Sequence, residues 1–163
     1  MTTKTQAVLD YLLQSPAISA FYYQYADAKA GAMQISGNAV DRASRRQYVD
    51  GSQQKRLDYT FSWYKPLACV PVIAGAESID SVAASDDVQG IIDWIDAQDD
   101  ARHYPDLGEQ CIVEQITCTT DTPRLAGIDT SSSPVLAQYQ LTIRLEYLDV
   151  SGCLWGRTER SNA

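Results

Sequence analysis

The sequence predicts an α+β protein, in which an antiparallel or mixed sheet of about four to six strands packs against two main helices. Residues 4–14 and 76–100 have the apolar spacing of amphipathic helices. Several other segments alternate apolar and polar residues, as half-buried strands do. The strand-like segments occur in groups broken by single helices, and this order favours α+β over an alternating α/β fold.

The first helix is expected over residues 4–14, because apolar residues there share one helical face. They are Val8, Leu9, Leu12 and Leu13. Pro16 disfavours helical angles in the residue before it, so the helix should end near Gln14. A strand is expected next over residues 19–27, with Phe21, Tyr23 and Tyr25 on one parity. A second short strand, residues 32–36, lies between two glycines.

A β-hairpin is expected over residues 45–64, because Asp50-Gly51-Ser52 is a strong turn signal in which glycine takes a positive φ freely. Its second strand carries large residues on one parity, which are Leu57, Tyr59, Phe61 and Trp63. Pro66 and Pro71 should end this strand.

The main helix is expected within residues 76–100, with Ser85 as its N-cap and acidic residues after the cap at the positive end of the helix dipole. Its apolar face consists of Val88, Ile91, Ile92 and Ile95. Gly90 costs the helix roughly 1 kcal/mol relative to alanine, which a close backbone approach to the sheet would explain.

The C-terminal half should contribute further strands. Residues 112–120 are expected to place Ile112, Ile116 and Cys118 on one side, and residues 121–134 to form a long mobile loop. The last strand, residues 137–147, alternates most regularly. Residues 1–150 are therefore expected to form one α+β domain, followed by a polar tail at 151–163.

Composition narrows the classes of function. The formal net charge of −8 disfavours sequence-specific binding of nucleic acid, although an acidic wall past which DNA slides stays compatible. No segment has the pattern of a signal peptide or a membrane span, so a cytosolic protein is expected. The four cysteines lack a disulfide framework, and Cys111 and Cys118 should lie on opposite faces of their strand.

Chemistry-bearing motifs are scarce. Structural zinc needs about four Cys or His ligands at short spacing, and the sequence has one histidine with dispersed cysteines. Neither phosphate-binding glycine motifs nor a nucleophile elbow occur. Any histidine general base must be His103, for which a surface position near a helix end is the favoured interpretation. We therefore expect no catalytic, cofactor or metal site.

A cluster of basic residues, expected to form an arm on the hairpin, stands out against the acidic background. Five of the thirteen basic residues flank the Asp50-Gly51 turn, namely Arg42, Arg45, Arg46, Lys55 and Arg56. They either guard a solvated sheet edge against strand addition or contact an acidic neighbouring subunit. Because every copy has a net charge of −8, the second role would offset repulsion between copies.

The order of these motifs resembles that of a group of siphophage proteins, the tail-terminator or minor capsid (head–tail joining) proteins. The resemblance rests on Tyr48-Val49-Asp50-Gly51-Ser52 with the basic residues and strand 57–63 after it, on Asp93-Trp94-Ile95, on Pro105-x-Leu107 and on the closing strand 137–147. It covers roughly residues 45–148. Residues 121–134 and 151–163 are longer than the family pattern, which leaves the position in the particle open.

The resemblance implies a sheet packed against helices and a structural role in the virion, after assembly in the host cytoplasm. The implied partners are further copies, usually in a hexameric ring, together with tail-tube and head-connector proteins, and no membrane. The expected contact residues are Arg45, Arg46, Lys55, Arg56, Leu125 and Ile128. The alternatives are a minor capsid protein, a binding module that uses the tyrosine-rich segment 21–25, and a small His103-dependent enzyme.

Overall fold

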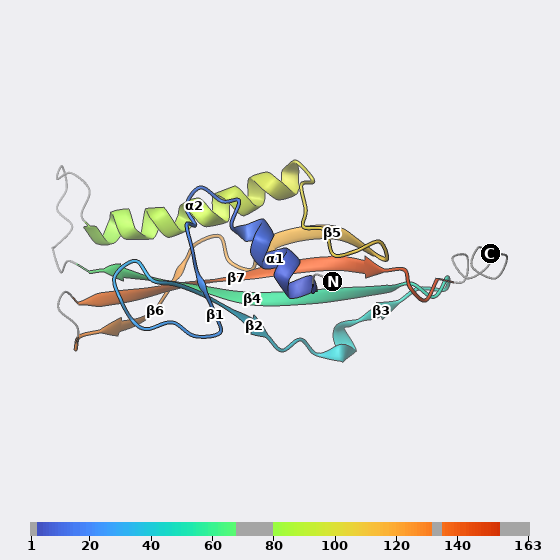
Figure 1. Cartoon of the computed structure of the whole chain (residues 1–163), viewed down its shortest axis with the longest axis horizontal. Coiled ribbons are helices and arrows are strands. Elements are labelled where there is room, and N and C mark those ends of the chain that lie inside the picture. The colour runs from blue at the N-terminus through green and yellow to red at the C-terminus, as the bar shows by residue number, and fades with distance from the viewer. Residues whose placement is uncertain (1–2, 68–79, 132–134, 154–163) are drawn as a thin grey trace.

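The computed structural model describes residues 3–67, 80–131 and 135–153. It confirms the α+β class (Figure 1). In chain order the elements are α1 (Lys4–Leu12), β1 (Tyr22–Tyr23), β2 (Met33–Asn38), the 3-10 helix η1 (Arg42–Ser44), β3 (Arg46–Gln47), β4 (Gln53–Pro66), α2 (Asp80–Asp100), β5 (Cys111–Cys118), β6 (Arg124–Asp129) and β7 (Leu136–Asp149). Predictions for Cys69, Pro71, residues 76–79 and residues 154–163 lie outside the described part.

Two long antiparallel strands, β4 and β7, form the centre of the sheet and pair along all 14 residues of each. The outer side of β4 pairs with β2 and β3, and the outer side of β7 with β5 and β6. The sheet is mixed, because the edge strand β1 runs parallel to β2. Within the described residues it has seven strands, one more than the expected maximum, because β6 forms where a loop was predicted.

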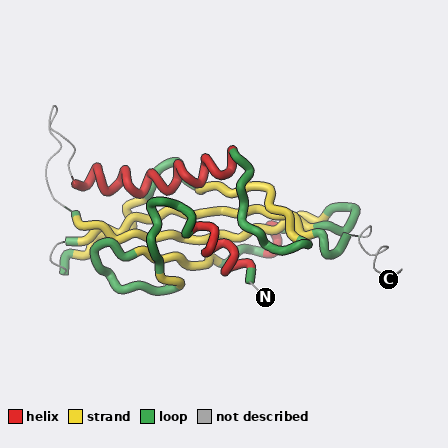
Figure 2. Tube along the Cα trace, turned by 45° about the horizontal axis from the view of Figure 1, so that its top comes forward, coloured by secondary structure: helices red, strands yellow, loops and turns green. Residues whose placement is uncertain are grey.

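Both helices cover the same face of the sheet, and α2 runs along its length (Figures 1 and 2). The alternation in β7 decides which side chains are buried beneath them. Those on the helix side are Ala137, Tyr139, Leu141, Ile143, Leu145 and Tyr147, all buried as predicted. From α2, the predicted apolar face of Val88, Ile91, Ile92 and Ile95 packs into the same core. The opposite face of the sheet carries polar residues such as Thr60 and Thr142.

The N-terminal helix forms, although Leu13 of its predicted apolar face lies at the C-cap and is exposed, and two details predicted for α2 were wrong. Thr3 caps α1 by accepting a hydrogen bond from the Gln6 backbone N–H at 3.1 Å. Ser85 does not cap α2, because the helix already includes Asp80 and Ser85 lies inside it. Gly90 is exposed, and an added Cβ would meet nothing within 4 Å, so no close approach to the sheet explains this glycine.

The strand predicted at 19–27 is mostly irregular, and only β1 is extended and paired. Gln24 has a φ of +73°, which interrupts the extended run directly after Tyr23. Phe21 packs against the core, whereas Tyr23 and Tyr25 are exposed. Aromatic residues on one parity were therefore a misleading strand signal here.

A β-bulge between Val113 and Gln115 makes the predicted side-chain orientations in β5 wrong. The extra residue reverses the parity, so that Ile112 is exposed while Ile116 is fully buried. For the same reason Cys111 and Cys118 lie on one face of the strand, not on opposite faces. Both remain free thiols.

The loop predicted over 121–134 contains β6, which pairs with β7. Its polar and small residues hide the strand, and a second bulge between Leu125 and Gly127 disturbs the alternation. The hairpin at 45–64 is confirmed through the pairing of β3 with β4, and β4 ends at Pro66 as expected.

Candidate interaction surface

The structure brings four of the six predicted contact residues into one hollow. Arg45, Arg46, Lys55 and Arg56 line a concave region of about 500 Å³, together with Ala43, Ser44, Gln54 and Glu146. The hollow lies where η1 and β3 run beside the start of β4. We refer to residues 42–49 as the arm and to this concavity as the basic hollow.

Local hydrogen bonds fix the arm beside the sheet. Asp41 caps η1, because its carboxylate accepts from the Ala43 backbone N–H at 2.9 Å and its carbonyl accepts from the Ser44 hydroxyl at 2.7 Å. Arg46 then pairs with Gln54 in the β3–β4 ladder. An aspartate cap followed by a short paired strand therefore sets the direction in which the arm leaves the sheet.

Lys55 and Arg56 are already engaged within the chain. Lys55 Nζ donates to Asp149 Oδ2 at 2.6 Å. Burial raises the pKa of Asp149, but the hydrogen bonds from Lys55 and Ser151 outweigh it and lower that pKa to about 2. Arg56 Nε lies 3.6 Å from Asp58 Oδ2.

The two exposed arginines of the arm differ from Lys55 and Arg56 in their partners. Asp58, the carboxylate near Arg56, already accepts two hydrogen bonds from Arg144 at 3.2 and 3.3 Å. Arg45 and Arg46, by contrast, are exposed and make no ion pair within the described part of the chain. Arg45 and Arg46 are therefore the predicted basic contacts that remain free to bind a partner.

Leu125 and Ile128 belong to a separate surface. On β7 they pair with Tyr139 and Ala137, whereas Lys55 pairs with Tyr147. At about 3.3 Å per residue along a strand, these positions are roughly 30 Å apart. Both apolar side chains are about half exposed. The predicted contact residues therefore form two surfaces at opposite ends of the sheet.

The hairpin tip adds an apolar element that the sequence prediction of contact residues missed. Val49 is fully exposed and Tyr48 is 44% exposed. Beneath them Gly51, with a φ of +90°, packs so closely on the 150–153 turn that an added Cβ would lie 2.2 Å from the Gly152 carbonyl oxygen. An apolar residue directly before an Asp-Gly turn was the available signal, since such a side chain projects from the hairpin end.

Helix α2 gives the molecule a strongly acidic side. Its sequence contains seven aspartates and no lysine or arginine. Partial burial raises the pKa of Asp96, and the neighbouring carboxylates of Asp93, Asp100, Asp121 and Asp99 raise it further. The charge of the chain is therefore unevenly distributed, with exposed arginines on the arm and repelling carboxylates along α2.

His103 lies on the surface, just beyond the end of α2. The side chain is exposed, and its Nδ1 lies 2.6 Å from Gln98 Oε1. Burial raises the pKa of the Cys118 thiol to about 12 and also raises that of Cys111, so neither is an activated thiolate. The described residues contain no group of three or more His, Cys, Asp or Glu placed to hold a metal ion.

The tyrosine-rich segment forms a different concavity from the one that a binding module would need. A groove of about 440 Å³ is lined by Tyr22 and Tyr25, by residues 19–20 and by the 26–33 segment, which contributes the charged Asp27 and Lys29. Of the three rings proposed for that role, Tyr25 alone lines this groove, because Phe21 packs against the core and Tyr23 is not among its lining residues.

No protein-family model matches this chain, and no curated protein matches it either. None of the helices in the described residues is long and apolar enough to cross a bilayer.

Proposed function

We propose that this chain is a self-assembling structural subunit of a tailed-phage particle, a tail terminator or head–tail joining protein that forms a ring at the tail end. One observation carries the proposal: Arg45 and Arg46 project, without ion pairs in the described residues, from a chain whose net charge is −8. The family resemblance implies a sheet packed against helices, and the α+β fold of this chain is compatible with the more specific assignment.

Charge explains why such an arm favours assembly. Copies with a net charge of −8 repel one another, so a stable contact needs cations placed against carboxylates. The exposed Val49 beside the arginines adds apolar area that a partner would bury. The arginines of the arm and the carboxylates that they bind are different parts of the chain, so the same contact can repeat head to tail from copy to copy, and such heterologous contacts close into rings when the rotation permits.

Light scattering over a range of concentrations, with negative-stain microscopy of the same samples, tests assembly. We expect rings whose abundance rises with concentration and falls with added salt. The double variant R45E/R46E should keep its circular dichroism spectrum and lose the rings. The single variants Arg45→Glu and Arg46→Glu should each weaken ring formation, whereas Lys29→Glu, their matched control, reverses one exposed charge outside the arm and should not. Unchanged rings in the double variant would refute the role of the arm.

The position in the particle needs a separate measurement. Antibody labelling of purified phage particles should place the chain at the junction of head and tail. Label distributed over the capsid shell would contradict this position and favour the minor capsid alternative. A wild type that stays monomeric at every concentration and is missing from particles would overturn the proposal as a whole.

A further inference from the structure

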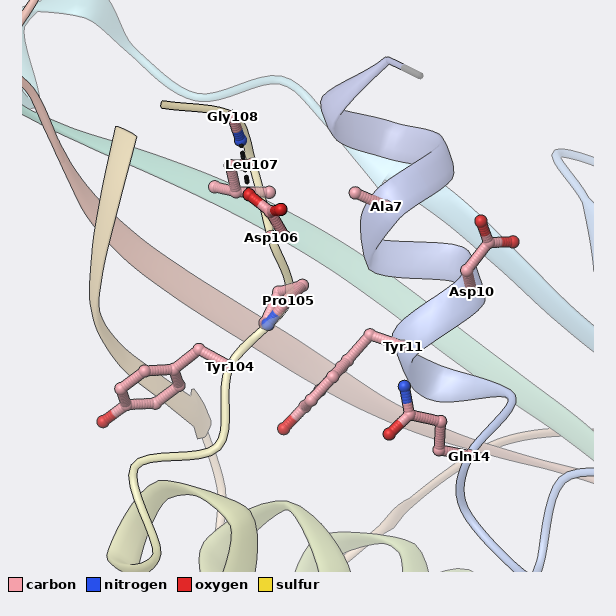
Figure 3. Close-up of a pocket in the computed structure, with 9 residues that line it drawn as sticks. All are labelled: Ala7, Asp10, Tyr11, Gln14, Tyr104, Pro105, Asp106, Leu107 and Gly108. Carbon is pink, nitrogen blue, oxygen red and sulfur yellow. Dashed lines mark hydrogen bonds between the residues drawn. The ribbon is translucent and has the colours of Figure 1, made fainter. Parts of the chain in front are cut away.

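A groove lies between α1 and the segment 104–108, outside the arm. Its volume is about 570 Å³. The lining residues are Ala7, Asp10, Tyr11, Gln14, Tyr104, Pro105, Asp106, Leu107 and Gly108. Both elements that border it carry an exposed carboxylate, Asp10 on α1 and Asp106 on the 104–108 segment, and in Figure 3 Asp10 projects from the side of α1 turned away from that segment, at the outer rim.

The polar side chains of this groove are almost entirely hydrogen-bond acceptors. Asp10 and Asp106 each accept a single hydrogen bond from the described residues, from Gln6 at 2.8 Å and from the Gly108 backbone N–H at 3.0 Å. Each carboxylate therefore keeps lone pairs for a ligand. No lysine or arginine lines the groove.

The tyrosine hydroxyls of the groove do not supply donors. Tyr11 donates its hydroxyl hydrogen to the His103 carbonyl at 2.9 Å, and Tyr104 donates to Asp99 at 2.9 Å. Among the lining side chains, the Gln14 amide remains as a donor. A ligand for this groove must therefore bring its own donors, and a positive charge for the two carboxylates.

The walls between the carboxylates are aromatic and apolar. Tyr11, Pro105 and Leu107 are buried residues of this lining and form an apolar floor with little exposed area, so the half-buried Tyr104 is the aromatic ring that a ligand can contact. A planar guanidinium combines five donors, a permanent positive charge and a weakly hydrated face that packs on aromatic rings. An arginine side chain therefore suits this groove better than a lysine ammonium does.

The chain itself carries such a ligand. Arg45 and Arg46 are exposed, lack ion pairs within the described residues and are followed by the exposed Tyr48 and Val49. In their own chain both arginines line the basic hollow, so they leave the groove unfilled. We infer that the groove between α1 and residues 104–108 binds the arm of a second copy, with Arg45 and Arg46 against Asp10 and Asp106. This inference rests on the proposed function, and it identifies the acidic surface that the arm of the next copy would bind.

Reciprocal charge reversal in the full-length chain tests the contact. The groove variant is Asp10→Arg/Asp106→Arg, and the arm variant is R45E/R46E. Each alone should weaken self-association at least about tenfold in sedimentation velocity, as charge reversal at a close ion pair does. An equimolar mixture should recover association, because the intact arm of the groove variant meets an intact groove, and the acidic arm of the other meets a basic groove.

Asp93→Arg/Asp96→Arg on α2 is the matched control, since it changes net charge equally at exposed carboxylates outside the groove. It should associate as the wild type does. Recovery in the mixture also shows that both variants are folded. If the wild type assembles and the groove variant assembles equally well, or the control is equally impaired, this contact is wrong while the proposed function stands. If the mixture stays dissociated, the arm is not the occupant. A wild type that never associates overturns both.

Discussion

Asp99, in the last turn of α2, accepts a hydrogen bond from the Ile116 backbone N–H at 3.0 Å. Ile116 is fully buried and lies just beyond the bulge of β5. The same carboxylate accepts from the Tyr104 hydroxyl at 2.9 Å. One aspartate therefore fixes the end of the helix, the bulged strand and the segment that forms one wall of the groove.

Asp99→Ala should destabilise the fold by about 1–3 kcal/mol, because it leaves a part-buried backbone N–H without its acceptor. Urea denaturation measures the change. Asp100→Ala, at the exposed neighbouring position, is the control and should change stability by less than about 0.5 kcal/mol. Equal effects of the two substitutions would show that the hydrogen bonds of Asp99 contribute nothing specific.

The ion pair between Lys55 and Asp149 should make the stability of the fold depend on pH in the acidic range. The pKa of Asp149 is lowered to about 2 in the folded protein, so its contribution is fully present above its ordinary pKa and is lost as the pH falls towards 2. Lys55→Met should therefore cost roughly 1–2 kcal/mol at neutral pH. The difference in free energy of unfolding between wild type and variant, measured by urea denaturation, should shrink as the pH falls from 5 to 2. A difference that stays constant over this range would contradict the assignment.

The ionised carboxylate of Asp96 should have the opposite effect on stability from that of Asp149. Partial burial and then the neighbouring carboxylates raise its folded-state pKa, so the folded protein binds a proton more readily than the unfolded chain, and stability falls as the pH rises through that range. Asp96→Asn should therefore raise the melting temperature at neutral pH, by an amount that decreases with added salt because the carboxylate is largely exposed. A lower melting temperature would contradict repulsion along α2.

Two glycine-to-alanine substitutions should have opposite effects. At Gly51 the added Cβ would meet the Gly152 carbonyl oxygen at 2.2 Å and the positive φ is unfavourable, so Gly51→Ala should destabilise the protein. At Gly90 the space is open and the residue is helical, so Gly90→Ala should stabilise it by up to about 1 kcal/mol. Thermal denaturation compares them, and a shift of the same sign in both would contradict the described packing.

The sequence predicts the elements whose pattern repeats over many residues. Leu141 and Ile143 in β7, and Ile91 and Ile95 in α2, were expected in the core and are buried there, because a constant period leaves one face apolar. Bulges are the main reason for the failures. A single extra residue reverses the parity of Ile112 and its neighbours, and sequence alternation does not mark where the extra residue falls.

The candidate surface was predictable to the extent that it is local in sequence. Arg45 and Arg46 flank a recognisable turn, and the hairpin places them together as expected. The engagement of Lys55 was not predictable, since its partner Asp149 comes from a strand far along the chain. Leu125 was expected in a loop whose position relative to the arm the sequence does not give, and the pairing of β6 with β7 places it at the other end of the sheet.

The most direct test of self-association is sedimentation velocity over a wide range of concentrations. The wild type and R45E/R46E are compared under identical conditions. The expected result is a species several times heavier than the 18.0 kDa chain, which grows with concentration and dissociates in the variant or in high salt. A single 18.0 kDa species for both proteins at every concentration would contradict the central claim that this surface binds further copies.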